Sequence, residues 1–90
     1  MNAVVHVNGT PAIAPLYRLQ YEAVQENWVL LYPEGMVKLN QSAAEILKRC
    51  NGELDIAAIV SDLESTFSVS GLQADVEDFL QVANERGWIA

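Results

Sequence analysis

The stretch LLYPEGMVKLNQSAAEIL, residues 30–47, decides the fold of this chain. It begins in an apolar strand, and Pro33-Glu34-Gly35 then supply hairpin-turn chemistry, because proline presets φ and glycine accepts a left-handed backbone. A further strand is predicted over Met36–Asn40. Ser42 and Glu45 match a capping box at the start of a helix. A strand that runs straight into a helix leaves an unpaired edge beside helices, and such an edge is a docking surface for an extended peptide.

Two strands are expected before this stretch. Leu16–Glu22 alternates apolar and polar residues, which is typical of a half-buried strand. Trp28–Tyr32 is apolar on both faces and fits a central strand. Turn and breaker residues punctuate residues 1–15, which are expected to be a flexible N-terminal tail. Residues 16–90 are expected to form a single domain.

Three helices are expected after the strands. The first is predicted to end near Cys50, where Asn51-Gly52 supply a left-handed stop. Asp55 is expected to cap the second helix, and Leu72–Arg86 to form the third. The second carries an apolar stripe at helical spacing, consisting of Ile56, Ile59, Val60, Leu63 and Phe67. The predicted fold class is α+β: a three-stranded antiparallel β-meander followed by three α-helices, related to a winged helix-turn-helix.

Two features leave a structural and a functional interpretation open. With residues placed at about 100° per step, the third helix has a flank beside its core stripe, formed by Asp75, Phe79, Val82 and Arg86. This flank is either a groove wall with polar ends or part of a wide core stripe with ordinary surface charges. Lys38 is either a gatekeeper against edge-to-edge aggregation or part of a docking edge.

The net charge of −7 lies in the second half of the chain, where Arg86 stands against eight carboxylates. This surface would repel nucleic acid, whose binding depends on neutralised phosphates. The acidic excess is either a solvated surface or a face that steers a basic partner. No apolar run approaches the roughly 20 residues that span a bilayer, so no membrane contact is expected. No signal peptide is recognised, and a lone Cys50 fits a reducing compartment, so the expected location is cytoplasmic.

The sequence predicts no catalytic, cofactor or metal site. The glycine-rich phosphate loops are absent, and His6 and Cys50 alone cannot make a zinc or iron–sulfur ligand set. Cys50 is interpreted as a small core residue, with a redox thiol as the alternative. The chain is therefore not expected to be an enzyme.

Beyond these patterns, the chain resembles the PqqD family, the small peptide chaperones of pyrroloquinoline quinone biosynthesis. The resemblance covers residues 14–90. The residues that carry it are Leu30-Leu31-Tyr32-Pro33-Glu34-Gly35, Leu39-Asn40, Ala43, Ile46-Leu47, Cys50-Asn51-Gly52, Ile59-Val60, Leu63, Asp75-Val76, Phe79-Leu80 and Gly87-Trp88. It implies the winged-helix-like fold of a precursor-peptide recognition domain.

The resemblance also implies a function and a site. Members of the family bind the precursor peptide PqqA and present it to PqqE, a radical S-adenosylmethionine enzyme that joins a glutamate to a tyrosine. The peptide adds as a strand beside the third strand and lies against the third helix. Mapped onto this chain, the implied site consists of Met36, Val37, Lys38, Leu39, Asp75, Val76, Phe79, Val82 and Arg86. The chain is expected to be a monomer or a weak, strand-swapped homodimer, and the alternative function is a homo-oligomerising module that uses its exposed strand edge.

Overall fold

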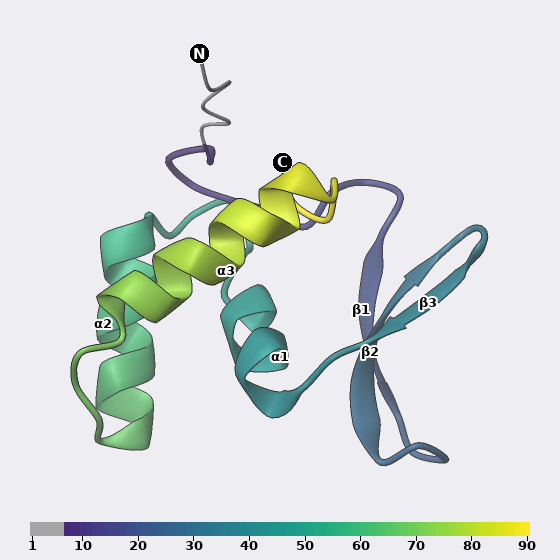
Figure 1. Ribbon diagram of the computed structural model, residues 1–90, viewed down its shortest axis with the longest axis horizontal. Coiled ribbons are helices and arrows are strands. Elements are labelled where there is room, and N and C mark those ends of the chain that lie inside the picture. Colours follow the sequence, from purple (N-terminus) through teal and green to yellow (C-terminus); the bar gives the residue numbers. More distant parts are fainter. Residues whose placement is uncertain (1–6) are drawn as a thin grey trace.

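The computed structural model describes residues 7–90, so His6 lies outside the described residues. A three-stranded antiparallel sheet in the order β1-β2-β3 is followed by three helices (Figure 1). The elements are β1 Arg18–Glu22, β2 Asn27–Tyr32, β3 Gly35–Lys38, α1 Gln41–Lys48, α2 Ile56–Phe67 and α3 Gln73–Glu85. The predicted α+β order of a β-meander followed by three helices is confirmed.

The sheet is built around β2, which pairs with β1 on one side and β3 on the other. Successive residues of a strand point to opposite faces, and here both Val29 and Leu30 are fully buried. The prediction of a central strand is confirmed, because β2 lies between β1 and β3. The outer strands are shorter than expected: β1 begins at Arg18, which leaves Leu16 72% exposed, and β3 ends at Lys38.

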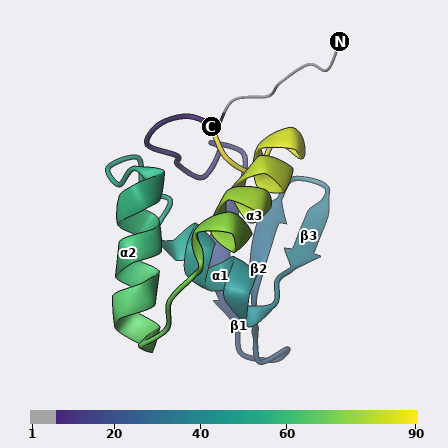
Figure 2. The ribbon, with the colours of Figure 1, turned by 60° about the vertical axis from the view of Figure 1, so that its left-hand side comes forward.

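The helices form a layer on one side of the sheet. α1 packs on β1 and β2, α2 packs on α1, and α3 packs on α2 (Figures 1 and 2). Their inward faces and the inward face of β2 share one apolar core, whose largest fully buried members include Leu30, Leu47, Ile59 and Leu80. α3 packs mainly on α2, and its inward residues join Leu30 of β2 in the same core.

The start and end of α1 differ from the sequence prediction. Asn40, not Ser42, is the N-cap, and its Oδ1 accepts a hydrogen bond from the Ala43 N–H at 2.8 Å. Asn40 has the extended backbone that an N-cap needs. The helix therefore begins at Gln41, and Ser42 lies inside its first turn. The helix ends at Lys48, before the predicted end near Cys50. Gly52 has the predicted left-handed backbone, with a φ of 82°, but its N–H donates to the carbonyl of Pro11 at 3.1 Å, so it does not cap α1.

The predicted cap of α2 is confirmed. Asp55 Oδ1 accepts from the Ala58 N–H at 2.7 Å, so the carboxylate also lies at the positive end of the helix dipole. At its other end α2 stops at Ser68, whose φ of 54° is left-handed. That reversal turns the chain toward α3.

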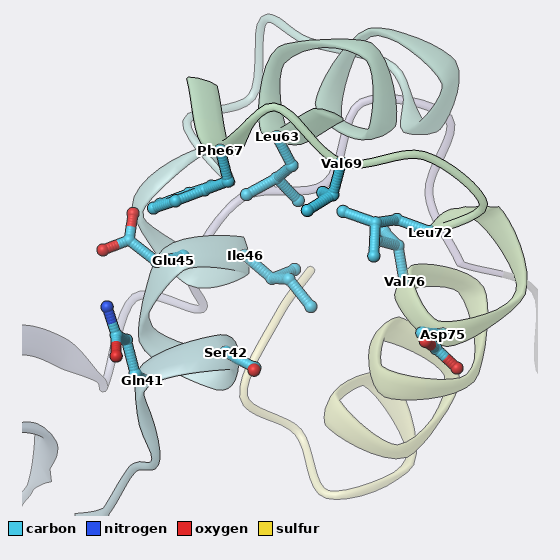
Figure 3. Close-up of a pocket in the computed structure, with 10 residues that line it drawn as sticks. All are labelled: Gln41, Ser42, Glu45, Ile46, Leu63, Phe67, Val69, Leu72, Asp75 and Val76. Atoms are coloured by element: carbon cyan, nitrogen blue, oxygen red, sulfur yellow. The ribbon is translucent and has the colours of Figure 1, made fainter. Parts of the chain in front are cut away.

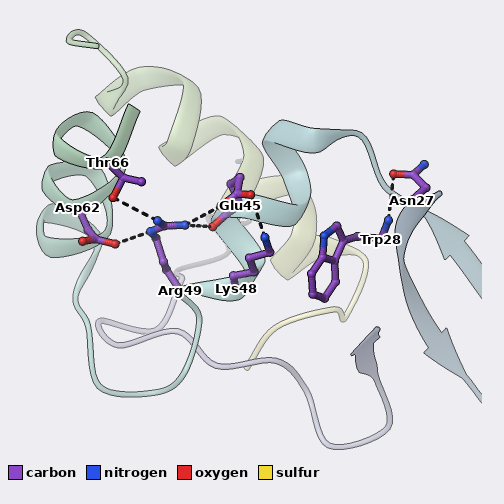
Figure 4. Close-up of polar contacts among 7 residues, drawn as sticks. All are labelled: Asn27, Trp28, Glu45, Lys48, Arg49, Asp62 and Thr66. Atoms are coloured by element: carbon purple, nitrogen blue, oxygen red, sulfur yellow. Dashed lines mark hydrogen bonds and ion pairs between the residues drawn. The ribbon is translucent and has the colours of Figure 1, made fainter. Parts of the chain in front are cut away.

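A polar cluster ties α1 to α2 and to the sheet (Figure 4). Arg49 pairs with Asp62 of α2 and, at 3.1 Å, with Glu45, while Lys48 reaches Glu45 at 2.9 Å and lies 4.5 Å from the centroid of a Trp28 ring. The hydrogen bond from Lys48 is the largest influence on Glu45 and lowers the pKa of that carboxyl. Burial disfavours the charged Arg49, but its bonds to Asp62 and Glu45 outweigh that effect and raise its pKa. Both shifts favour the charged forms of Glu45 and Arg49.

Residues 11–14 belong to the folded domain, which corrects the predicted tail over 1–15. Ala12 and Ala90 exchange backbone hydrogen bonds of 3.1 and 2.8 Å, and the Ile13 N–H donates to the Cys50 carbonyl at 3.2 Å. Pro11 is fully buried. This segment therefore closes one end of the domain by joining the C-terminal residues to the end of α1. No helix within residues 7–90 is both long and apolar enough to cross a bilayer.

Candidate functional site

The free edge of β3 is the first part of the candidate site. Within residues 7–90, β3 pairs with β2 alone, and in an antiparallel ladder successive residues turn their N–H and C=O groups alternately toward and away from the partner strand. The Leu39 N–H donates to the Trp28 carbonyl at 3.0 Å, so Leu39 and Val37 face β2. Met36 and Lys38 consequently turn their backbone groups outward. The edge offers two residues, not a continuous row, for pairing with another strand.

The side chains along this edge fall into two groups. Met36 is 39% exposed, Lys38 is exposed, and Lys38 forms no ion pair within residues 7–90. Val37 is partly buried against the core, and Leu39 is only 3% exposed. Leu39 lies just after β3, and its side chain belongs to the core. It can support the edge but offers no surface to a ligand.

The flank of α3 is the second part of the candidate site. Val76, Leu80 and Ala83 are buried, so they form the inward stripe of the helix. Asp75 and Arg86 are exposed, Val82 is 42% exposed, and Phe79 is partly buried. Burial thus separates the inward stripe from Asp75, Val82 and Arg86, while Phe79 packs against the edge of the core. Val76 is the exception among the predicted site residues, because at 2% exposure its side chain is core.

The C-terminal end of the flank is fixed by Trp88. The Phe79 and Trp88 rings lie 6.4 Å apart, and the Arg86 guanidinium lies 5.5 Å from the Trp88 ring. Trp88 is 9% exposed, so it holds these two side chains from beneath. From the sequence, Trp88 is one of the residues that carry the family resemblance, but no positioning role is predicted for it, since aromatic contact across the end of a helix has no periodic signal.

A pocket of about 280 Å³ lies at the other end of the flank (Figure 3). Its walls come from the start of α1, the end of α2, the α2–α3 connection and the start of α3. Asp75 and Val76 line it, so it adjoins the predicted site, whereas none of the β3 residues does. Phe67 and Val69, 43% and 46% exposed, also line it and were not predicted as site residues. Phe67 belongs to the apolar stripe predicted for the second helix, but it lies in the last turn of α2, where the stripe extends beyond the core and is exposed.

The thiol of Cys50, the candidate for a redox role, lies in the core. Cys50 is 3% exposed, its Sγ donates to the Ile46 carbonyl at 3.4 Å, and burial raises its thiol pKa to about 11. A thiol of that pKa is a poor nucleophile at neutral pH, which argues against the redox alternative. In the part of the chain from residue 7 onward, no three His, Cys, Asp or Glu side chains gather as a metal site would require. The edge, the flank and the pocket can pair backbone and bury apolar side chains.

Comparison with known proteins places this geometry in context. Residues 27–89 match the family model described as coenzyme PQQ synthesis protein D (PqqD). A protein of Pseudomonas fluorescens named PqqA binding protein is 53% identical over 81 residues, which is 89% of each chain. A protein of the same name from Methylococcus capsulatus is 44% identical over 77 residues, or 86% of this chain and 83% of that one.

A solved structure shares the fold. It is the solution NMR structure of the PqqD truncation of Methylobacterium extorquens PqqCD, described as a functional, stand-alone recognition element for ribosomally synthesised and post-translationally modified peptides. The two chains superpose with a TM-score of 0.69 and are 26% identical, over 94% of this chain and 95% of the other. The three strands and three helices described above therefore occur in a peptide-recognition domain.

Proposed function

This chain belongs to the PqqD family, and on that premise we propose that it is a non-catalytic adaptor that binds the precursor peptide PqqA. One observation carries the proposal: β3 has an unpaired edge, in a chain whose relatives are named PqqA binding proteins. An extended peptide can complete such a sheet with its own backbone, which is a recurring mode of peptide recognition.

The proposed binding mode follows from the two parts of the site. The outward N–H and C=O groups of Met36 and Lys38 pair with the peptide backbone, and this pairing supplies affinity without reading sequence. Phe79 and Val82 on the α3 flank supply apolar contact for its side chains. Ordering a short peptide costs about 2–5 kcal/mol or more. We therefore expect an affinity between nanomolar and micromolar, not tighter.

The adaptor role consists of presenting the bound peptide to the radical S-adenosylmethionine enzyme PqqE. Holding the peptide on a domain that also contacts the enzyme raises its effective concentration at the active site. No reactive group of this chain takes part, which agrees with the buried thiol of Cys50. The chemistry then belongs to the enzyme, and the adaptor determines which peptide reaches it.

Isotope-labelled chemical-shift titration tests the proposal. The chain is titrated with the PqqA peptide of Pseudomonas fluorescens, and we expect saturable shifts at the Met36 and Lys38 amides and along the exposed side of α3. Absence of binding would overturn the proposal, as would shifts confined to the free edge of β1. Sedimentation with and without peptide tests the rival oligomerising module, which predicts a tight dimer that ignores the peptide.

A further inference from the structure

The pocket at the start of α3 has no role in the strand pairing proposed above. The side chains of Ile46, Leu63, Val69 and Leu72 converge in Figure 3, and the exposed polar residues Ser42 and Asp75 lie at the margin of the pocket. Val69 stands in the α2–α3 connection and is 46% exposed. A hollow lined mainly by apolar side chains, some of them half-exposed, is a place where an apolar group of a ligand can be buried.

We propose that this pocket is a side-chain subsite that takes one large apolar residue of the bound peptide, next to a lysine or arginine of that peptide. The inference rests on the proposed function and names what the adaptor reads in its ligand. Backbone pairing along β3 cannot distinguish one sequence from another, so selectivity needs a place where a side chain is enclosed. A central apolar anchor in a pocket is also where binding energy concentrates.

The position of the pocket makes it reachable from the strand edge. Gln41 and Ser42 line it, and only Leu39 and Asn40 separate them from the end of β3. Asp75 and Val76 line the opposite side and begin the α3 flank. A peptide strand that leaves β3 at Lys38 and follows the flank therefore meets the opening of the pocket. The strand edge and the pocket are consecutive sections of one path.

Size and charge select the occupant. A cavity of about 280 Å³ lies at the lower end of the range of pockets for whole small molecules, about 300–1,000 Å³, and has room for one large side chain. Asp75 at the opening forms no ion pair within residues 7–90, in contrast to Glu45, which is held by Lys48 and Arg49. With a net charge of −7 on the whole chain, the opening favours a cationic neighbour to the apolar anchor.

Val69→Ser tests the pocket, and Val24→Ser is the matched control. Val24 lies in the β1–β2 turn and is 99% exposed, so the same change there touches no wall of the pocket. Val69 is preferred to Phe67 as the position to change, because the Arg49 guanidinium lies 6.0 Å from the Phe67 ring and a substitution of Phe67 would also remove that contact. We expect Val69→Ser to weaken calorimetric binding of Pseudomonas fluorescens PqqA by about three- to tenfold, the loss of part of one apolar side chain. Val24→Ser should bind like the unmodified chain.

Three further arms sharpen the test. Ser42→Phe fills the opening instead of removing a wall, and should weaken binding more than Val69→Ser does. Alanine substitution of the large apolar residues of the peptide should reveal one anchor residue. Its loss should weaken binding to the unmodified chain but not binding to Val69→Ser. Replacing a lysine or arginine beside that anchor with glutamine should weaken binding to the unmodified chain but not binding to Asp75→Asn.

The outcomes separate this inference from the proposed function. If Val69→Ser and Ser42→Phe bind the peptide as the unmodified chain does, the subsite is refuted while the adaptor role stands. If the unmodified chain binds no peptide, the adaptor role is refuted and the subsite with it. If the variants change self-association in sedimentation and leave peptide affinity unchanged, the pocket is a contact between copies and the subsite is refuted.

Discussion

The alternation of backbone groups along β3 predicts that Lys38→Pro weakens peptide binding in a domain that stays folded. The Lys38 N–H points away from β2, so proline removes a donor that the sheet itself does not use. Proline at Val37 is a different experiment. The Val37 N–H faces β2, so proline at this position removes a hydrogen bond from the β2–β3 ladder.

The size of the effect follows from one lost hydrogen bond. A hydrogen bond contributes about 0.5–1.5 kcal/mol net, and leaving its partner unsatisfied costs about 1–3 kcal/mol. The peptide carbonyl that faced Lys38 loses its donor, and the proline ring also crowds it. We therefore expect Kd to rise by about 5- to 150-fold, since 1.4 kcal/mol is a factor of ten.

Calorimetry with the PqqA peptide measures this effect, and a thermal melt establishes that the variant is folded. Lys38→Ala is the control, because it removes the side chain and keeps the N–H. The backbone argument requires Lys38→Ala to bind within about threefold of the unmodified chain, since an exposed side chain contributes little. A folded Lys38→Pro variant with unchanged Kd would show that the peptide does not pair with this edge.

Three other predictions concern the scaffold. Asn40→Ala should lower stability by about 1 kcal/mol and the melting temperature by roughly 4–8 °C, whereas Ser42→Ala should be nearly neutral; equal effects would refute the cap assignment. The pKa of Glu45 is lowered in the folded state, so the stabilisation that its charge provides is present above the unfolded pKa and is lost as pH falls through the folded pKa. In denaturant melts at pH 7, Glu45→Gln should be less stable than the unmodified chain by up to about 1 kcal/mol. In strong acid the two should be equally stable. Cys50 should react with a thiol reagent only as fast as the domain opens, because it is 3% exposed and burial raises its pKa to about 11; rapid labelling of native protein would contradict that burial.

The sequence predicts the parts of the fold that follow a period. The spacing of Val76, Leu80 and Ala83 sets the inward stripe of α3, and both the stripe and its flank are where helical geometry places them. The apolar run around Val29 and Leu30 likewise predicts a central strand. In each case a single element carries its own signal, because burial on one face repeats at a fixed interval.

The misses come from contacts between distant residues. The sequence of residues 11–14 does not predict their hydrogen bonds to Cys50 and to residues 88–90, because isolated β-bridges produce no repeating pattern of apolar residues. The cap of α1 is missed for a local reason: Asn40 and Ser42 are both good N-caps, and only the backbone angles select between them. The pocket assembles from four segments, so no single element predicts it.

The two interpretations of Lys38 that the sequence leaves open are compatible in the structure. Its side chain is exposed while its backbone groups lie on the free edge, so one residue can discourage pairing between sheets and still pair with a peptide. Charge decides between the two partners. A second copy of the chain brings another net charge of −7 toward the first, which opposes edge-to-edge association. A peptide with a lysine or arginine near the opening at Asp75 would meet attraction instead, so on the proposed mode of binding the acidity that opposes self-association would favour the ligand.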